Sequence, residues 1–275
     1  MSASKRGRTK SWMGGPSVSK EVFERVFHKM DTEDVAALSG VCCAFRDAAR
    51  DVFEERRRDV SRGSERFPIP CENSVDAERF PFKFTYISKS VLPENSLELD
   101  EDGSGIQSSL SVPVELRKSD KKGWGVHACG EIAEGSLVCE YVGEIISSKE
   151  AVRRLKEYDS ATSGEGHCLL VVREILPSRR MQLRSNIDAT KMGNVARFIN
   201  HRCDGGNLEL LIGRGRGQFL PRIMLHAKFD IRSGEELSFS YGESLSAPLS
   251  PGGKNKRPCF CGAGCCGGYL PAEEI

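Results

Sequence analysis

The chain has 275 residues, of which 29% are charged and 39% hydrophobic, and its formal net charge is +1 at pH 7. This length allows one sizeable domain beside a smaller one, and the composition is ordinary for a globular protein. A charge so close to zero provides no global field, so we expect neither sequence-specific nucleic-acid binding nor a membrane partner. The sequence contains no run of 18 apolar residues and no secretory leader, so we expect neither a membrane span nor secretion.

The first sixty residues carry two signals. Residues 1–16 are basic and rich in glycine, and we expect a disordered tail whose basic run at 5–10 serves either nuclear import or no particular role. Residues 17–60 show helical periodicity. The apolar face of the first predicted helix is Val22, Phe23, Val26, Phe27 and Met30. The second helix begins at Asp31 or Thr32, and residues 52–58 provide a third. The apolar face of the second is Val35, Leu38, Val41, Phe45 and Ala49.

Two short amphipathic helices bury little apolar surface alone, so they need either the third helix at residues 52–58 or a partner. Their sequence, VFERVFHKMDTEDVAALSGVCCAFRDAA, resembles an F-box, the helical module that binds the Skp-type adaptor of ubiquitin ligases. The resemblance implies such an adaptor as a partner. A plain helical hairpin packed on the rest of the chain accounts for the same pattern.

Residues 61–111 change in character. Prolines at 68, 70 and 81 stand among alternating aromatic residues, and proline restricts such a segment to extended arms or edge strands. Residues 96–111 are acidic, rich in glycine and serine, and free of cysteine. That composition is typical of a linker.

Residues 112–245 mix strand and helix signals. A strand predicted at 112–116 leads to a tight turn at 123–125, where glycine lets the backbone approach a ligand and Trp124 offers a flat apolar wall. Two strands are predicted around Gly143, followed by a helix that a capping box at 147–150 begins and that runs to about residue 158. Another strand is predicted to start near residue 165.

The stretch 186–207 is unusually polar for its apolar surroundings. Its polar members are Asp188, Asn194, Arg197, Asn200 and His201. Buried polar groups need hydrogen-bond partners, or folding loses roughly 1–3 kcal/mol for each. The pattern indicates either a functional segment or a short surface helix over 193–199 followed by a glycine-rich loop.

Four ordered motifs resemble those of the SET-domain protein lysine methyltransferases. They are KKGWG at 121–125, EYVGEI at 140–145, RFINH at 197–201 with Cys203 after it, and ELSFSYG at 236–242. The resemblance covers about residues 112–268. It implies an α+β, mainly-β fold of several small sheets with a pseudoknot, behind a small helical N-terminal region. It also implies a histone-lysine N-methyltransferase that uses S-adenosylmethionine.

The same resemblance implies the residues of the site. The cofactor contacts are Lys122, Gly123, Trp124, Gly125, His167, Arg197, Asn200, His201 and Tyr241. His167 stands where the family usually has a tyrosine, which weakens that contact.

Tyr241 is the candidate central catalytic residue, and Tyr141 and Phe239 would line the channel of the target lysine. Methyl transfer to an amine requires a neutral amine, in-line geometry and exclusion of water. The Tyr241 hydroxyl would orient the amine and the transferring methyl group. Ordinary strand packing is the alternative for these three aromatic residues when they are considered without the motifs.

Eleven cysteines are present, and four of them lie within residues 259–266. Such clustering favours a metal site over a disulfide framework. The spacing C-x-C-x4-C resembles that of the post-SET segment, which we assign to residues 246–275. The resemblance implies one structural zinc with the ligands Cys203, Cys259, Cys261 and Cys266, and it leaves Cys265 free.

Residues 68–87, PIPCENSVDAERFPFKFTYI, resemble the pre-SET leader of the suppressor-of-variegation branch. That branch acts on lysine 9 of histone H3, which implies the histone H3 tail as partner and a nuclear, chromatin-associated protein. The zinc-cluster cysteines that normally follow the leader are missing. A natural variant, a splice form and an error of gene prediction are all compatible with this loss. Two alternatives to an active enzyme remain. One is a ubiquitin-ligase adaptor with a non-catalytic SET module, and the other is an inactive variant that lacks the pre-SET zinc cluster.

Overall fold

The computed structural model describes residues 20–30, 32–77, 84–92, 109–160, 166–175, 182–214, 220–242 and 257–271. The basic tail, nearly all of the predicted linker and residues 243–256 lie outside these ranges. The chain divides into two compact units, Met1–Val52 and Phe53–Ile275. No helix in the described ranges is long and apolar enough to cross a membrane.

The first unit is helical, as predicted, and contains α1 (Lys20–Lys29), α2 (Thr32–Ser39) and the start of α3 (Cys43–Arg58). Its packing centres on Phe27, whose ring lies edge-on to Phe45 at 5.7 Å between centroids. Val35 and Ala49 are buried, also as predicted. The apolar residues of this unit therefore gather around one aromatic pair.

Two details of the helical prediction are wrong. Val22 and Val26 are 47% and 49% exposed, so the buried face of α1 is narrower than its apolar stripe. The predicted second helix is also broken, because Gly40 and Val41 donate to Ala37 and Leu38 in tight turns that end α2. Val41 is 66% exposed there, and α3 then runs without interruption through the predicted third helix.

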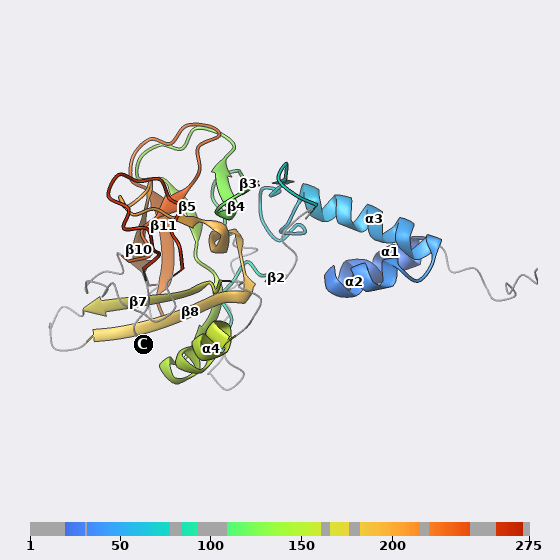
Figure 1. Cartoon of the computed structure of the whole chain (residues 1–275), viewed down its shortest axis with the longest axis horizontal. Helices are drawn as coiled ribbons and strands as arrows, with labels where there is room; N and C mark the ends of the chain where they lie inside the picture. Colours follow the sequence, from blue (N-terminus) through green and yellow to red (C-terminus); the bar gives the residue numbers. More distant parts are fainter. Residues whose placement is uncertain are drawn as a thin grey trace, which may run out of the picture. The chain divides into compact units, whose positions relative to one another are not determined.

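The second unit is built from small sheets and holds α4 as its one complete α-helix within the described ranges (Figure 1). The sheets have the orders β1-β3-β4, β10-β11-β5, β12-β9 and β2-β8-β6, and β7 pairs with β8. This is the mainly-β architecture that the resemblance implied. Its elements are β1 Cys71–Glu72, β2 Thr85–Tyr86, β3 Val114–Ser119, β4 Gly123–Ala128, β5 Leu137–Glu140, β6 Gly143–Ile146, α4 Ser148–Ser160, β7 Leu169–Ile175, β8 Gln182–Gly193, the 3₁₀ helix η1 Val195–Phe198, β9 Asn200–His201, β10 Leu208–Gly213, β11 Arg222–Ala227 and β12 Ser238–Phe239.

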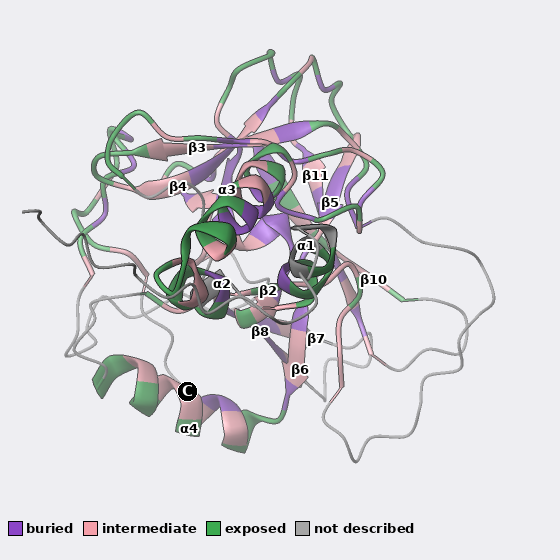
Figure 2. Cartoon of the chain, turned by 90° about the vertical axis from the view of Figure 1, so that its right-hand side faces the viewer, coloured by how far each residue is buried: buried purple, intermediate pink, exposed green. Residues whose placement is uncertain are grey.

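Several local predictions are confirmed. The leader forms edge strands, since β1 and β2 each pair in parallel at the side of a sheet. The Ser147 hydroxyl accepts the Glu150 N–H at 3.2 Å at the start of α4, which is one of the two bonds of a capping box. The Glu150 carboxylate accepts from Arg153 and Arg154. Figure 2 shows that α4 keeps one side exposed, and Ala151 is its buried residue.

The polar stretch folds differently from the predicted surface helix. Residues 182–193 form the long strand β8, and only 195–198 turn as a 3₁₀ helix, which is buried. The Asn194 side chain caps that turn by accepting the Ala196 N–H at 3.2 Å. The predicted linker also ends differently, because Leu110 is 1% exposed and belongs to the main core.

Candidate active site and metal centre

Four sulfur atoms from two distant parts of the chain meet. Cys203 follows β9, and its partners Cys259, Cys261 and Cys266 come from the C-terminal segment; all four Sγ atoms lie within 4.8 Å of one another. The Cys203 and Cys259 sulfurs are 3.8 Å apart. A tetrahedral zinc site with Zn–S bonds of about 2.3 Å has sulfur–sulfur distances of about 3.8 Å, so the cluster fits one zinc ion. Cys265 is exposed and outside the cluster.

The protonation of this cluster is uneven. Burial raises the pKa of Cys261, but the N–H groups of Cys203 and Ala263 and the neighbouring thiols outweigh it and bring it to about 6. Burial raises the pKa of Cys203, and so do the hydrogen bonds that its thiol donates to the neighbouring sulfurs. A divalent cation favours the thiolate form at every position. Metal binding would therefore release protons from this cluster.

The RFINH and ELSFSYG motifs lie side by side. Strand β9 pairs in parallel with β12, and the register places Asn200 opposite Ser238 and His201 opposite Phe239. The pairing brings together residues that are separated by the whole β10–β11 hairpin. It sets His201 next to Tyr241, with ring centroids 5.2 Å apart.

His201 connects the thiol cluster to Tyr241. The Tyr241 N–H donates to His201 Nδ1 at 3.1 Å, and His201 Nε2 lies 3.2 Å from the Cys203 sulfur. Because Nδ1 accepts a hydrogen bond, the neutral ring carries its proton on Nε2, where it faces the sulfur. Burial lowers the pKa of His201, which favours this neutral form.

The three predicted channel aromatics are brought together. The Tyr241 hydroxyl donates to the Ile199 carbonyl at 2.8 Å, and the Tyr141 hydroxyl donates to the Cys168 carbonyl at 2.8 Å. The rings of Phe239 and Tyr241 have centroids 5.1 Å apart. Burial raises the pKa of both tyrosines above the ordinary value. Both hydroxyls therefore stay neutral at physiological pH, and neither can act as a phenolate base.

The glycine-rich turn lies against the same two motifs. Gly123 has φ +70°, a conformation that favours glycine. A side chain at Gly125 would meet the Glu236 carboxylate at 2.9 Å and the Asn200 amide at 3.0 Å. The backbone of this turn must therefore be bare for those two polar groups to reach it.

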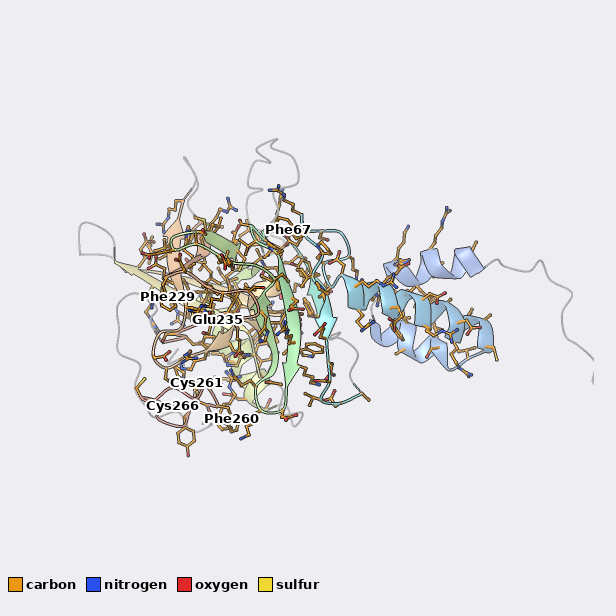
Figure 3. All side chains as sticks on the ribbon, turned by 90° about the horizontal axis from the view of Figure 1, so that it is seen from above. Phe67, Phe229, Glu235, Phe260, Cys261 and Cys266 are labelled. Atoms are coloured by element: carbon orange, nitrogen blue, oxygen red, sulfur yellow. The ribbon has the colours of Figure 1, made fainter. Side chains whose placement is uncertain are left out.

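A pocket of about 430 Å³ opens beside His201. Its volume is within the range of about 300–1,000 Å³ that is usual for small-molecule sites, and it carries both cationic and anionic side chains. That mixture suits a ligand with an ammonium, a carboxylate and a sulfonium. Figure 3 shows Phe229, Glu235 and Cys261 on this side of the unit. The lining is Lys122, His201, Arg202, Asp204, Gly206, Asn207, Phe229, Glu235, Glu236, Ser238 and Cys261.

Of the nine predicted cofactor contacts, Lys122 and His201 line this pocket and the other seven do not. Two of these seven have bonds or stacking contacts elsewhere. Arg197 donates to the carbonyls of Ala189 and Thr190 at 2.8 and 3.2 Å, and its guanidinium lies 4.4 Å from the centroid of the Phe84 ring. His167 stacks on Tyr158 with 5.9 Å between ring centroids. Both residues pack locally in this structure.

The sequence reasoning missed Glu236. It also treated Asp188 and Asn194 as candidates for function, whereas both are fully buried in structural bonds. The Asp188 carboxylate accepts from Arg154 at 2.9 Å and from Tyr158 at 2.7 Å. These bonds fasten α4 to β8, and their partners lie too far along the chain for spacing to reveal them.

The fold and the site define a class. Residues 123–242 match the family model for the SET domain, so this region of the chain is a SET domain. Among curated proteins, it is 48% identical over 173 residues to the histone-lysine N-methyltransferase SUVR3 of Arabidopsis thaliana, covering 61% of this chain and 48% of that relative. It is 34% identical over 176 residues to the histone-lysine N-methyltransferase SETMAR of Mus musculus, covering 62% of this chain and 55% of the relative. The chain thus spans about half the length of these relatives.

Solved structures agree. The structure of Arabidopsis thaliana SUVH6 in complex with SAM superposes with a TM-score of 0.59 at 25% identity, covering 78% of this chain and 55% of the other. The structure of KRYPTONITE with mCHH DNA, an H3(1-15) peptide and SAH gives a TM-score of 0.56 at 26% identity, covering 78% and 53%. None of these four proteins is named as a ubiquitin-ligase adaptor, so they give the adaptor alternative no support.

Proposed function

We propose that this protein is an S-adenosylmethionine-dependent protein-lysine methyltransferase that acts on the histone H3 tail, with lysine 9 as its target. The observation that carries the proposal is that the hydroxyls of Tyr141 and Tyr241 are both held by backbone carbonyls, with Phe239 against Tyr241 and with a pocket lined by His201 beside them. The names of the relatives support the activity, and the H3 peptide bound by KRYPTONITE supports the substrate class. The leader supports lysine 9.

The chain's own residues would perform most of the work. S-adenosylmethionine, when bound, supplies an electrophilic methyl group. Lys122, His201 and the turn at 123–125 would hold it, since Lys122 and His201 line the pocket. Tyr141 and Phe239 would form the apolar wall of the lysine channel and exclude water, which favours the uncharged amine.

The Tyr241 hydroxyl would orient the lysine nitrogen. Its proton is already donated to the Ile199 carbonyl, so its oxygen presents lone pairs to the reacting groups. An ammonium has no lone pair with which to attack, so the lysine must lose its proton before transfer. Neither tyrosine ionises at physiological pH to accept that proton, which therefore leaves to solvent. We therefore expect the rate to rise with pH as the substrate amine deprotonates.

We further propose that the four cysteines hold a structural zinc that pins the segment after residue 246 over the cofactor, and that the protein works in the nucleus on chromatin. The donor set of four thiols supports zinc. In this arrangement residues 61–111 act as a leader and linker, and 112–245 as the catalytic domain. The helices within 17–60 form a separate F-box-like module.

The test is mass spectrometry of H3 tail peptides incubated with zinc-loaded protein and S-adenosylmethionine. We expect mass increases of whole methyl groups on a peptide with lysine 9 and none on the same peptide with that lysine replaced by arginine. Methylation of both peptides would contradict the lysine assignment. A folded, metal-loaded protein that modifies neither would contradict the enzyme.

A further inference from the structure

Glu236 joins two parts of the proposed cofactor site with its two carboxylate oxygens. One oxygen pairs with the Lys122 ammonium, and the other accepts the Asn200 side-chain N–H at 2.9 Å. The same Asn200 amide reaches the Trp124 carbonyl at 3.3 Å. One carboxylate therefore links the glycine-rich turn to the RFINH motif.

The backbone holds this carboxylate in place. The Leu237 N–H donates to the Val126 carbonyl at 2.7 Å, and the Asn207 amide donates to the Glu236 carbonyl at 2.9 Å. Glu236 is thus fixed on both sides, against β4 and against the loop that leads into β10. Its side chain lies directly over the bare backbone of Gly125, where a methyl group would come within 2.9 Å of it.

The charge of Glu236 suits this role. Burial raises its pKa, but the bonds from Lys122 and Asn200 outweigh that effect and hold it below the ordinary value. The side chains of Lys122 and Glu236 are each 27% exposed, so the pair is sheltered more than a surface ion pair. Hydrogen bonds to charged groups are shorter and roughly twice as strong as neutral ones.

We infer that Glu236 is the positioning residue of the cofactor site, which sets Lys122 and Asn200 at the spacing that the cofactor needs. This inference rests on the proposed function. Glu236 does not transfer the methyl group; it orders two groups that would otherwise move independently. Its loss should weaken cofactor binding and leave the peptide interaction and the chemical step nearly unchanged.

The test compares Glu236→Ala, Glu236→Gln and the exposed control Glu131→Gln by calorimetric titration with S-adenosylmethionine. We expect the Kd for S-adenosylmethionine to rise roughly tenfold or more in Glu236→Ala, as is usual when bonds to a charged group are lost. Glu236→Gln should lie between, because its amide oxygen still accepts from Asn200. The control should match the native protein. If Glu236→Ala does not fold, Glu236→Gln alone decides.

Two further measurements separate positioning from a merely structural role. The KM for S-adenosylmethionine should rise while kcat and the peptide KM change little. Lys122→Met should weaken binding on its own but add little to Glu236→Gln, because the pair is already broken. Native affinity in a folded Glu236→Ala variant, or additive effects of Lys122→Met, would overturn the inference alone. Native protein that binds no S-adenosylmethionine would overturn the proposed function as well.

Discussion

The two segments that flank the SET domain are fastened to it by different chemistry. The C-terminal segment meets the domain at Cys203, through sulfur atoms that fit a metal ion. The N-terminal leader is anchored at Glu65, a carboxylate that is 8% exposed and accepts from the Tyr86 hydroxyl at 2.9 Å, and from the Leu110 N–H at 3.1 Å and the Ser109 hydroxyl at the end of the linker before the domain. The C-terminal contact supplies ligands for a metal ion, whereas the leader is held by hydrogen bonds and by the packing of Ile69, Cys71 and Phe84 in the main core.

The leader's bonds continue into the domain. The Asn194 amide donates to the Ser109 hydroxyl at 2.9 Å and to the Glu140 carbonyl at 2.7 Å. Its oxygen accepts the Val142 N–H at 3.3 Å. Tyr141 stands between these last two residues, so the leader's polar bonds end beside the channel wall.

The comparison of these two contacts indicates how a leader can be joined to a SET domain without the pre-SET zinc cluster. The expected cysteine segment is missing between the leader and Leu110, yet both of its ends are held by one carboxylate. A buried acceptor with three donors provides a local anchor that needs no metal. The proposed enzyme should therefore depend on metal at its C-terminal end only.

The first prediction concerns the cysteine cluster, where we expect the largest effect. It tests whether the C-terminal contact depends on a metal ion. Cys266→Ser should lose the metal and release the C-terminal segment to protease, because structural zinc contributes folding energy directly. Cys265→Ser should keep both, since Cys265 lies outside the cluster. Bound zinc is measured by elemental analysis and the segment by limited proteolysis. Equal metal loss in the two variants would show that the assigned ligands are wrong.

The leader is tested next. Glu65→Ala leaves three donors without their acceptor, at about 1 kcal/mol or more for each, so we expect the free energy of unfolding to fall by about 3 kcal/mol. Urea denaturation measures it, with the exposed Glu72→Ala of the same segment as control. The zinc content should not change. Zinc loss in Glu65→Ala would mean that the two ends are not independent.

A third test concerns Tyr241, the proposed catalytic residue of the SET domain. Tyr241→Phe removes the hydroxyl but keeps the ring and the bond of its backbone to His201. Turnover should fall roughly 100-fold, as when one positioned hydrogen-bonding group is deleted from an active site. Zinc content and affinity for S-adenosylmethionine should be retained, by elemental analysis and calorimetry. Cofactor affinity that falls together with the rate would make Tyr241 a structural residue.

The sequence could predict the residues of the site better than the structure that surrounds it. The cysteine spacing and the aromatic residues belong to short local motifs. In the structure, the four cysteine side chains lie together, and so do the aromatic side chains. The roles assigned to them stay predictions. The class of fold is confirmed by the solved structures of similar proteins. The order of the motifs is enough to predict the class of fold, because each motif corresponds to one element of that fold.

The rest depends on partners that spacing does not reveal. Glu65 bonds to Tyr86 and Ser109, which are 21 and 44 residues away. Strand β8 was missed because buried Asn186 and Asp188 interrupt its apolar pattern, and their partners come from other elements. Asn186, for example, donates to the Ile146 carbonyl at 3.2 Å. A buried polar residue looks functional in a sequence until its partner is known.

The fourth test concerns Phe239 in the wall of the proposed lysine channel. Phe239 has no hydroxyl with which to hold a water molecule, so the space for further methyl groups can be cleared. We expect di- or trimethyl-lysine from the native protein, and Phe239→Tyr should stop at the first methyl group while largely keeping the rate of that first transfer. Product masses over time measure this, with excess cofactor for both proteins. A native enzyme that stalls after one methyl group would contradict the argument.

The smallest expected effect tests how far the C-terminal segment reaches. Burial, and then the charge of Arg257 from that segment, lower the pKa of His167 from 6.5 to about 4. Because the folded state prefers neutral His167, this residue's stabilisation is complete above pH 6.5 and is lost as the pH falls toward 4. His167→Gln should flatten the decline of the melting temperature over that window, by less than one proton's worth of linkage. A zinc chelator should displace Arg257 and raise the pKa of His167 in an NMR titration, whereas Glu65→Ala should leave it unchanged. An unchanged pKa of His167 after chelation would show that burial alone sets it and that the C-terminal segment does not act on His167.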